Sequence, residues 1–247
     1  MPAEITWVGH ATVLIEIDGV RLLTDPVLGR GAGPLVRIGP RPDPSVARDI
    51  DAVLVSHLHH DHLAPRSLRR VGAPVIAPRG VGPWLRRRRV REVTEIGVGE
   101  SASVGSLRVT AVTATHDNRR LHIGPTADPL GFTVAGSSSV YFAGDTDLYG
   151  EMAALAGVDV ALLPIWGWGT TLGPGHLDPE RAARAAALIS PRVVVPIHWG
   201  SLALPKLIRG AAGTDGPARE FVDFASRLAP GVEVRVLAPG GRTVVAG

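Results

Sequence analysis

Apolar residues near the start of the chain fall into short runs separated by a few polar positions. These runs, rich in Val, Ile and Thr, predict short β-strands over 5–8, 12–17 and 20–24. The Asp18-Gly19 dipeptide predicts a tight hairpin turn. Residues 27–49 contain many Gly, Pro and Arg without a periodic pattern, so a long loop is expected there. The run DAVLVS then predicts a buried strand that stops at His57.

Strands and helices are predicted to interleave through the rest of the chain. The helix over 178–189 has the clearest signals, because Asp178 can cap it and Pro179 suits its first turn. Further helices are expected over 65–71, 82–89, 148–156 and 218–228. Further strands are expected over 74–77, 106–115, 130–144 with a turn near Gly136, 158–164, 192–197, 232–237 and 242–246. The alternation, without an evident linker or repeat, predicts one α/β domain over residues 1–247, with sheets inside and helices outside.

Composition narrows the picture. The chain has 247 residues, 45% hydrophobic and 20% charged, which is typical of a globular protein with a full core. It offers neither an apolar run long enough to span a membrane nor the pattern of a secretory signal, so a cytoplasmic protein is expected. Cysteine is absent, so any metal must be held by His and carboxylates. A net charge of only +3 argues against nucleic acid as a partner.

The stretch VLVSHLHHDHLAP, residues 53–65, concentrates histidines directly after the buried strand. His57 and His59 are two apart, so they point the same way in an extended segment, and Asp61 and His62 follow across a turn. Loops after strand ends are the usual place for active sites, and this set could hold two divalent ions. The alternative is a solvated polar turn that happens to be rich in histidine.

Three other strand ends carry a polar residue that core packing does not predict. His116 follows SLRVTAVTAT, Asp145 follows SVYFAG, and His198 follows RVVVPI. Any one of these alone would more often be a solvated or hydrogen-bonded residue. Together with the histidine stretch they mark four strand ends with the same feature, which favours one shared site.

On these residues the sequence resembles the metallo-β-lactamase superfamily over nearly its whole length. The pattern is His57-x-His59-x-Asp61-His62, followed in order by His116, Asp145 and His198. The segments TWVGHATVLIEIDGVRLLTDPV, GPRPDP, GHLDPE and PIHWGSLAL resemble two groups within it. These groups are the N-acyl-phosphatidylethanolamine phospholipases D, to which the resemblance is closer, and the ascorbate-6-phosphate lactonases. The resemblance implies a four-layer αββα sandwich.

The resemblance also implies a cofactor of two divalent ions, with zinc expected and manganese or iron as alternatives. His57, His59 and His116 would hold one ion. Asp61, His62 and His198 would hold the other, and Asp145 would bridge them. A water or hydroxide between the ions would be the nucleophile, since two cations lower its pKa.

Three further residues are assigned near the ions. Asp25 is expected to accept a hydrogen bond from a ligand histidine, or else to stabilise its own turn. His10 is expected to line the substrate pocket, or else to pack between strands. His176 resembles a histidine near the substrate in the phospholipase D group, so it is expected to join Asp61 in catalysis by donating to a substrate oxygen. The alternative for His176 is a solvent-facing place in a glycine-rich loop.

The outer part of the site is predicted from aromatic and basic residues. Trp166 and Trp168 are expected to form an apolar wall of the substrate pocket or to pack in the core. Arg119, with Arg120, could bind a phosphate or carboxylate, or lie on a solvated rim. No role is assigned to His60 or His122. The basic run over 84–90 is expected to form the polar face of a short helix, and the apolar run over 201–208 to touch a lipid or pack in the core.

Function follows from these assignments. A metal-dependent hydrolase of a small or lipid-like ester is expected, with a phosphodiester first and a lactone as the alternative. A nuclease is less favoured, because the net charge is small. A non-catalytic ligand-binding protein on the same scaffold is the alternative of another class, although all seven expected ligand positions are filled. A homo-oligomer remains open.

Overall fold

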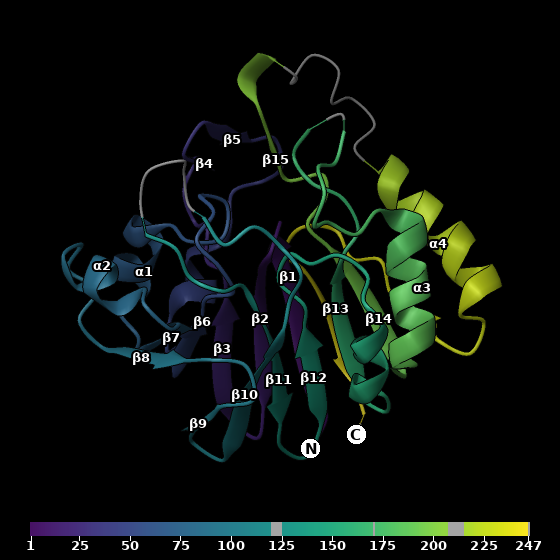
Figure 1. Ribbon diagram of the computed structural model, residues 1–247, viewed down its shortest axis with the longest axis horizontal. Helices are drawn as coiled ribbons and strands as arrows, with labels where there is room; N and C mark the ends of the chain where they lie inside the picture. Colours follow the sequence, from purple (N-terminus) through teal and green to yellow (C-terminus); the bar gives the residue numbers. More distant parts are fainter. Residues whose placement is uncertain (120–124, 170, 207–214, 247) are drawn as a thin grey trace.

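The computed structural model describes residues 1–119, 125–169, 171–206 and 215–246. Within these ranges the strands form two sheets of seven and a small sheet of three. The α-helices are α1 (Pro65–Val71), α2 (Gly82–Arg86), α3 (Pro179–Ile189) and α4 (Gly216–Leu228). Figure 1 shows α1 and α2 on one side of the sheets and α3 and α4 on the other. This is the predicted α/β sandwich with four layers.

The first sheet has the order β17-β1-β2-β3-β6-β7-β8. Its strands are β17 (Gly241–Val245), β1 (Ala3–Gly9), β2 (Thr12–Ile17), β3 (Val20–Thr24), β6 (Ala52–Leu54), β7 (Val75–Pro78) and β8 (Val93–Ile96). Pairing is antiparallel from β17 to β3 and parallel from β3 to β8. The hairpin between β2 and β3 turns at Asp18 and Gly19, with φ of 53° and 78°, which confirms the predicted turn.

The second sheet has the order β16-β14-β13-β12-β11-β10-β9. Its strands are β16 (Glu233–Val234), β14 (Val193–Ile197), β13 (Val160–Pro164), β12 (Ser139–Phe142), β11 (Leu130–Ala135), β10 (Leu107–Thr113) and β9 (Ser101–Val104). The strands β12, β13 and β14 are parallel, so all three end at the same edge. Since β11 is antiparallel to both β10 and β12, β10 ends at that edge as well.

A third, three-stranded sheet joins β4 (Gly31–Ala32), β5 (Leu35–Arg37) and β15 (Leu202–Ala203). Figure 1 shows it at the top of the molecule, beyond the ends of the large sheets. It lies partly in the segment 27–49, which was predicted as a single long loop, and the 3-10 helix η1 (Pro44–Ala47) also lies there. These strands are too short for a periodic pattern, and β5 pairs with a strand far away in the sequence.

Side chains that alternate along the strands separate the layers. Ile5, Trp7 and Ile15 of the first sheet are fully buried against residues of the second sheet such as Phe132 and Val134. The opposite face of the first sheet packs under α1 and α2 through a second cluster. Its members include Leu14, Leu23, Val53, Leu68 and Leu85. The first sheet therefore packs between the second sheet on one face and α1 and α2 on the other.

Helix predictions are largely confirmed. The α1 bounds agree with the predicted 65–71, and Oδ1 of Asp178 caps α3 by accepting from the Arg181 amide at 2.8 Å. The segment over 148–156 instead contains a 3-10 helix, η2 (Gly150–Leu155), so the predicted helix type was wrong. The helix predicted over 82–89 is shorter, because α2 ends at Arg86. Leu85 and Val90 of the basic run are buried as expected, and Arg88 lies over the Trp84 ring at 3.6 Å.

The strands differ from the prediction in two respects. The expected strand over 232–237 is only Glu233–Val234, because the chain leaves the sheet edge after two residues. The strands β8 and β9 were missed, since their polar and partly exposed positions give no apolar run. No helix among the described residues is long and apolar enough to cross a membrane.

Candidate metal centre

The strand ends that carry the predicted ligands meet at one edge of the two large sheets. His57, His59, Asp61 and His62 lie in the loop between β6 and α1. The other three residues follow strands of the second sheet: His116 comes after β10, Asp145 after β12 and His198 after β14. The structure brings all seven together, because every one of these strands runs toward the same edge.

His57, His59 and His116 form the first histidine group. Nδ1 of His59 lies 3.0 Å from Nε2 of His57 and 3.0 Å from Nε2 of His116. The rings meet edge to face, with His57 and His116 centroids 4.7 Å apart. Three ring nitrogens therefore converge on one point, and each comes from a ring with a different orientation.

His62, His198 and Asp61 form the second group. Nε2 of His62 lies 3.0 Å from Nε2 of His198. Oδ2 of Asp61 lies 3.9 Å and 3.7 Å from these two nitrogens. Two nitrogens and one carboxylate oxygen thus face one another in a fully buried place.

Asp145 lies between the two groups. Its Oδ2 is 3.2 Å from Nε2 of His62, 4.0 Å from Nε2 of His57 and 3.9 Å from Nε2 of His116. Its Oδ1 is 3.2 Å from Nε2 of His198 but has no hydrogen-bond partner among the described residues, although it is buried. A buried carboxylate oxygen without a partner is costly, so a cation at this position would stabilise it.

The nitrogens that point away from the centre are held by fixed partners. Nδ1 of His116 lies 2.6 Å from the Gly175 carbonyl, and Nδ1 of His198 lies 2.7 Å from the Trp166 carbonyl. A carbonyl only accepts, so these Nδ1 atoms carry the proton. In the neutral rings the inward Nε2 atoms then present lone pairs.

This donor set fits divalent cations. Two inward lone pairs 3.0 Å apart cannot form a hydrogen bond with each other, whereas a cation between them would accept both. Neutral imidazoles and carboxylates, without thiolates, suit zinc, manganese and iron. The residues that could hold such ions are the two histidine groups, with Asp61 and Asp145.

The pKa shifts in the two histidine groups also favour a bound cation. Burial lowers the pKa of His57 well below its usual range and lowers the pKa of His116 to about 4. Burial acts in the same direction on His62, but the carboxylates of Asp145 and Asp61 outweigh it and raise its pKa. The carboxylates therefore favour a positive charge beside His62, where a metal ion would supply one.

Asp25 lies directly behind His62. Its Oδ2 accepts from Nδ1 of His62 at 2.7 Å, and its Oδ1 accepts from the Ser56 amide at 2.7 Å. The Ser56 hydroxyl donates to Asp25 and lies 2.9 Å from Nδ1 of His57. Asp25 and Ser56 together orient one histidine of each group.

His10 lies in a different place from the one predicted. Its side chain is 0% exposed, so the prediction that it lines a substrate pocket is wrong. The alternative, packing between strands, describes its position better: it sits in the turn between β1 and β2, with Nε2 at 2.9 Å from Oδ2 of Asp61. The turn is held inward because the His10 amide donates to Oγ of Ser201 and the His10 carbonyl accepts from the His198 amide.

His176 reaches the cluster from the loop before α3. Its Nε2 lies 3.6 Å from Oδ2 of Asp145, and its side chain is 23% exposed. Its carbonyl accepts from Nη1 of Arg181 at 3.5 Å, and Nη2 of Arg181 pairs with Asp147 at 2.8 Å. This loop is thereby tied to the segment that follows Asp145, with His176 between solvent and the buried ligands.

The predicted aromatic and basic wall is only partly assembled. Trp166 packs against the main core and its Nε1 donates to the Gly169 carbonyl at 3.1 Å, whereas Trp168 is 40% exposed. Arg119 is exposed, and its guanidinium makes no ion pair with the described residues. Arg120, His122 and residues 207–208 of the apolar run lie outside the described part of the chain.

Some supporting residues gave no sequence signal. The carbonyls of Gly175 and Trp166 hold ligand histidines, and a backbone group is invisible in a residue pattern. Ser56 gave a weak signal, since it precedes His57 directly. Left-handed backbone at His10, Asp25 and His198, with φ of 57°, 33° and 65°, is also concentrated here, as is common at functional sites.

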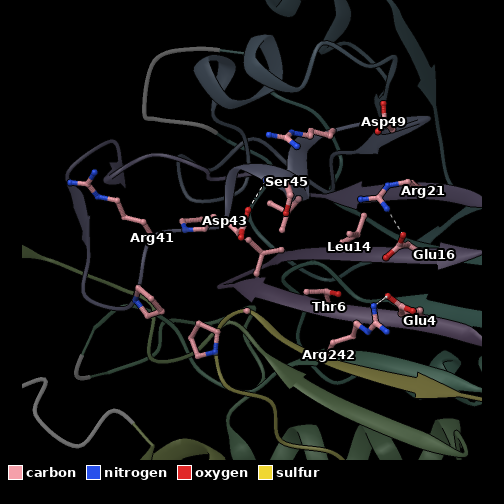
Figure 2. Close-up of a pocket in the computed structure, with 17 residues that line it drawn as sticks. Glu4, Thr6, Leu14, Glu16, Arg21, Arg41, Asp43, Ser45, Asp49 and Arg242 are labelled. Carbon is pink, nitrogen blue, oxygen red and sulfur yellow. Dashed lines mark hydrogen bonds and ion pairs between the residues drawn. The ribbon is translucent and has the colours of Figure 1, made fainter.

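A separate hollow of about 690 Å³ lies on the outer face of the first sheet (Figure 2). Two of its arginines form ion pairs within it: Arg21 with Glu16, and Nη1 of Arg242 with Glu4 at 2.6 Å. None of the seven predicted ligands lines it. The hollow is therefore separate from the histidine groups.

The similarities to known proteins cover the region that forms this centre. Residues 20–199 match the Beta-lactamase superfamily domain. The chain is 35% identical over 246 residues to a metal-dependent hydrolase of Methanopyrus kandleri, covering 96% of this chain and 97% of that protein. It is 35% identical over 220 residues to an uncharacterized protein of Mycobacterium tuberculosis, covering 81% of this chain and 59% of that one. Among solved structures, Igni18, a metallo hydrolase of Ignicoccus hospitalis, is similar with a TM-score of 0.74 and 26% identity over 99% of this chain and 98% of that chain.

Proposed function

Because the chain belongs to the metallo-β-lactamase superfamily and is a metal-dependent hydrolase, we propose that it cleaves a phosphodiester, or a related small or lipid-like ester, at a centre of two divalent ions. Zinc is the expected metal. His57, His59 and His116 hold one ion, and Asp61, His62 and His198 hold the other. The observation that carries the proposal is Asp145, whose carboxylate lies within 4.0 Å of nitrogens from both groups.

When bound, the ions would supply Lewis-acid chemistry, polarising a substrate oxygen and lowering the pKa of a water. The chain's own residues provide the rest. Asp25, Gly175 and Trp166 fix the tautomers of three histidines, so the inward nitrogens are ready to bind without rearrangement. The packed sheets exclude bulk water from the inner side of the groups, which strengthens every charge interaction there.

His176 is the proposed general acid, because its side chain is 23% exposed whereas those of the other described histidines within 4.0 Å of Asp145 are at most 1% exposed. A proton on its Nε2 could pass to the leaving oxygen of the substrate. Trp168 would offer an apolar surface to the substrate, and Arg119 would attract its negative charge. An exposed cation that forms no ion pair within the described part of the chain supports a phosphodiester over a neutral lactone.

The metal content tests the centre itself. Elemental analysis of the purified chain should find close to two ions per chain. Asp145→Asn should reduce the content of both ions, whereas Asp223→Asn, an exposed carboxylate on α4, should leave it unchanged. A folded, metal-free wild-type protein would contradict the proposal.

Hydrolysis assays test the reaction. Bis(p-nitrophenyl) phosphate should be cleaved by the wild type. Asp61→Ala should lower kcat/KM by at least about 100-fold, since loss of a residue that only supports a metal ligand already costs about 10–100-fold. Asp223→Asn again serves as the control. A panel of lactones decides the alternative: faster turnover of a lactone than of the phosphodiester would assign the chain to lactone hydrolysis instead.

A further inference from the structure

Among the described residues, the side chain that lies nearest to the Asp61 carboxylate is not another proposed ligand. Nε2 of His10 lies 2.9 Å from Oδ2 of Asp61, whereas the nitrogens of His62 and His198 lie 3.9 Å and 3.7 Å from the same oxygen. The carboxylate only accepts, so Nε2 of His10 donates. Nδ1 of His10 is buried and has no hydrogen-bond partner among the described residues, so the ring makes a single polar contact.

The backbone holds His10 firmly in this position. Its amide donates to Oγ of Ser201 at 2.9 Å, and its carbonyl accepts from the His198 amide at 3.0 Å. The same carbonyl accepts from Nε1 of Trp7 at 2.8 Å. The left-handed backbone at His10, with φ of 57°, is strained for a residue with a side chain, and these three bonds maintain it.

The ring of His10 is also packed against the second histidine group. Its centroid lies 3.8 Å from that of His198, with an angle of 36° between the planes. The side chain is fully buried, so it has no free space in which to change rotamer. The hydrogen bond to Asp61 is therefore preorganised, and it holds Oδ2 of that carboxylate in place.

From this geometry we propose that His10 is the positioning residue for Asp61, and through it for the second ion. The inference rests on the proposed function, because it takes Asp61 to be a ligand. A carboxylate held by an outer hydrogen bond presents its ligand oxygen in one orientation, and loss of such a partner typically weakens metal binding about 10–100-fold. Among the described residues, the ring of His10 lies against Asp61, His62 and His198, which belong to the second group.

The test measures metal retention in addition to activity. Loaded wild type, His10→Phe, His10→Gln and Ser201→Ala are equilibrated at a series of buffered free Zn²⁺ concentrations, and the ions per chain are counted. Phe keeps the flat ring but has no donor, and Gln can place an amide donor near Nε2. Ser201→Ala removes a bond to the His10 backbone and leaves the contact with Asp61, so it controls for loosening of the turn.

His10→Phe should lose one of two ions at about 10–100-fold higher free Zn²⁺ than wild type. His10→Gln should recover most of this loss, and Ser201→Ala, which keeps the donor to Asp61 but loses one bond to the His10 backbone, should lose less metal affinity than His10→Phe. Thermal unfolding confirms that each variant is folded. If His10→Phe does not fold, His10→Asn replaces it, because Asn tolerates left-handed backbone and its shorter side chain does not reach Asp61.

Three results would overturn the inference. Retention by His10→Phe within twofold of wild type would show that Asp61 needs no such partner. Equal losses in His10→Phe and His10→Gln would mean that His10 acts in another way, such as direct ligation. A wild-type chain that never holds a second ion would remove the proposed two-ion centre, and the inference with it, and the wild-type titration identifies that case by itself.

Discussion

Nε2 of His62 and Nε2 of His198 face each other at 3.0 Å. On the outer side, Nδ1 of His62 donates to Asp25 and Nδ1 of His198 donates to the Trp166 carbonyl. The pair joins the two sheets, since His62 follows β6 and His198 follows β14. Without a cation, the pair is either repulsive or must share a proton. The stability of the fold should therefore depend on metal.

Removal of metal should lower the unfolding temperature. An ion present at about 1,000 times its dissociation constant stabilises the folded chain by about 4 kcal/mol. For a domain of this size that corresponds to a loss of roughly 8–16 °C on chelation. Differential scanning calorimetry with and without a chelator, and again after Zn²⁺ is restored, measures it. Equal unfolding temperatures in all three conditions would show that the strand ends are stable without an ion.

Gly144→Ala should lower both the stability of the fold and its metal content. A Cβ on Gly144 would lie 2.7 Å from Cβ of Ser56 and 3.0 Å from the Leu130 carbonyl, and φ there is +62°. Left-handed strain costs about 1–2 kcal/mol, and overpacking adds about 1–3 kcal/mol. Because Ser56 holds both Asp25 and His57, metal content should fall as well.

Gly157→Ala is the matched control for that substitution. Gly157 has φ of +89°, and a Cβ there would meet nothing within 4 Å. It should therefore show only the backbone strain, by urea unfolding, and keep its metal. Similar losses of stability and metal in both variants would mean that the contact between Gly144 and Ser56 is unimportant.

The two tryptophans should separate stability from substrate binding. Trp166 packs against the main core, so Trp166→Ala should cost about 3–5 kcal/mol of unfolding free energy. Trp168 is 40% exposed, so Trp168→Ala should cost much less but raise KM for substrates with an apolar group. Denaturant unfolding and steady-state kinetics measure the two effects. An unchanged KM in Trp168→Ala would remove this residue from the proposed substrate wall.

Stability in chelator should depend on pH through His10. Burial, followed by the nearby His198, lowers the pKa of His10 to about 3, whereas an unfolded histidine titrates near 6.5. Between these values the unfolded chain binds a proton that the folded chain does not. Unfolding is therefore favoured as pH falls below about 6.5, by up to about 1.4 kcal/mol per pH unit for this group.

His10→Gln isolates this effect, because Gln does not titrate. The difference in unfolding free energy between wild type and His10→Gln should shrink or reverse as the pH is lowered from 7 to 5. Urea unfolding at several pH values measures it. Parallel curves for the two proteins over this range would contradict the pKa assigned to His10.

Strands, helices and strand ends were predicted because they leave local patterns, whereas the four-layer arrangement followed from the resemblance to the metallo-β-lactamase superfamily. Apolar runs marked β6, β10, β12 and β14, and a polar residue after each run pointed to the shared edge. The small sheet of β4, β5 and β15 left no such pattern, because its pairing joins segments that are distant in the sequence. Strands of two or three residues depend on that partner and not on their own composition.

The places of individual side chains were harder to predict. His10 carries a polar group in a turn, which suggests exposure, yet its backbone bonds to His198 and Ser201 draw it inward. Trp166 and Trp168 are two residues apart and have similar local sequence, but only Trp166 meets the core. Such differences are decided by tertiary packing, which the residue pattern does not contain.

His62 and His198 are separated by 136 positions in the chain. During synthesis the segment with His57, His59 and His62 leaves the ribosome long before β14 exists, so the growing chain carries histidines without their later partner. The proposed second ion would therefore find its full set of ligands only at the end of synthesis, after both sheets have closed. An ion captured by the second group would then report that the chain has been finished and folded.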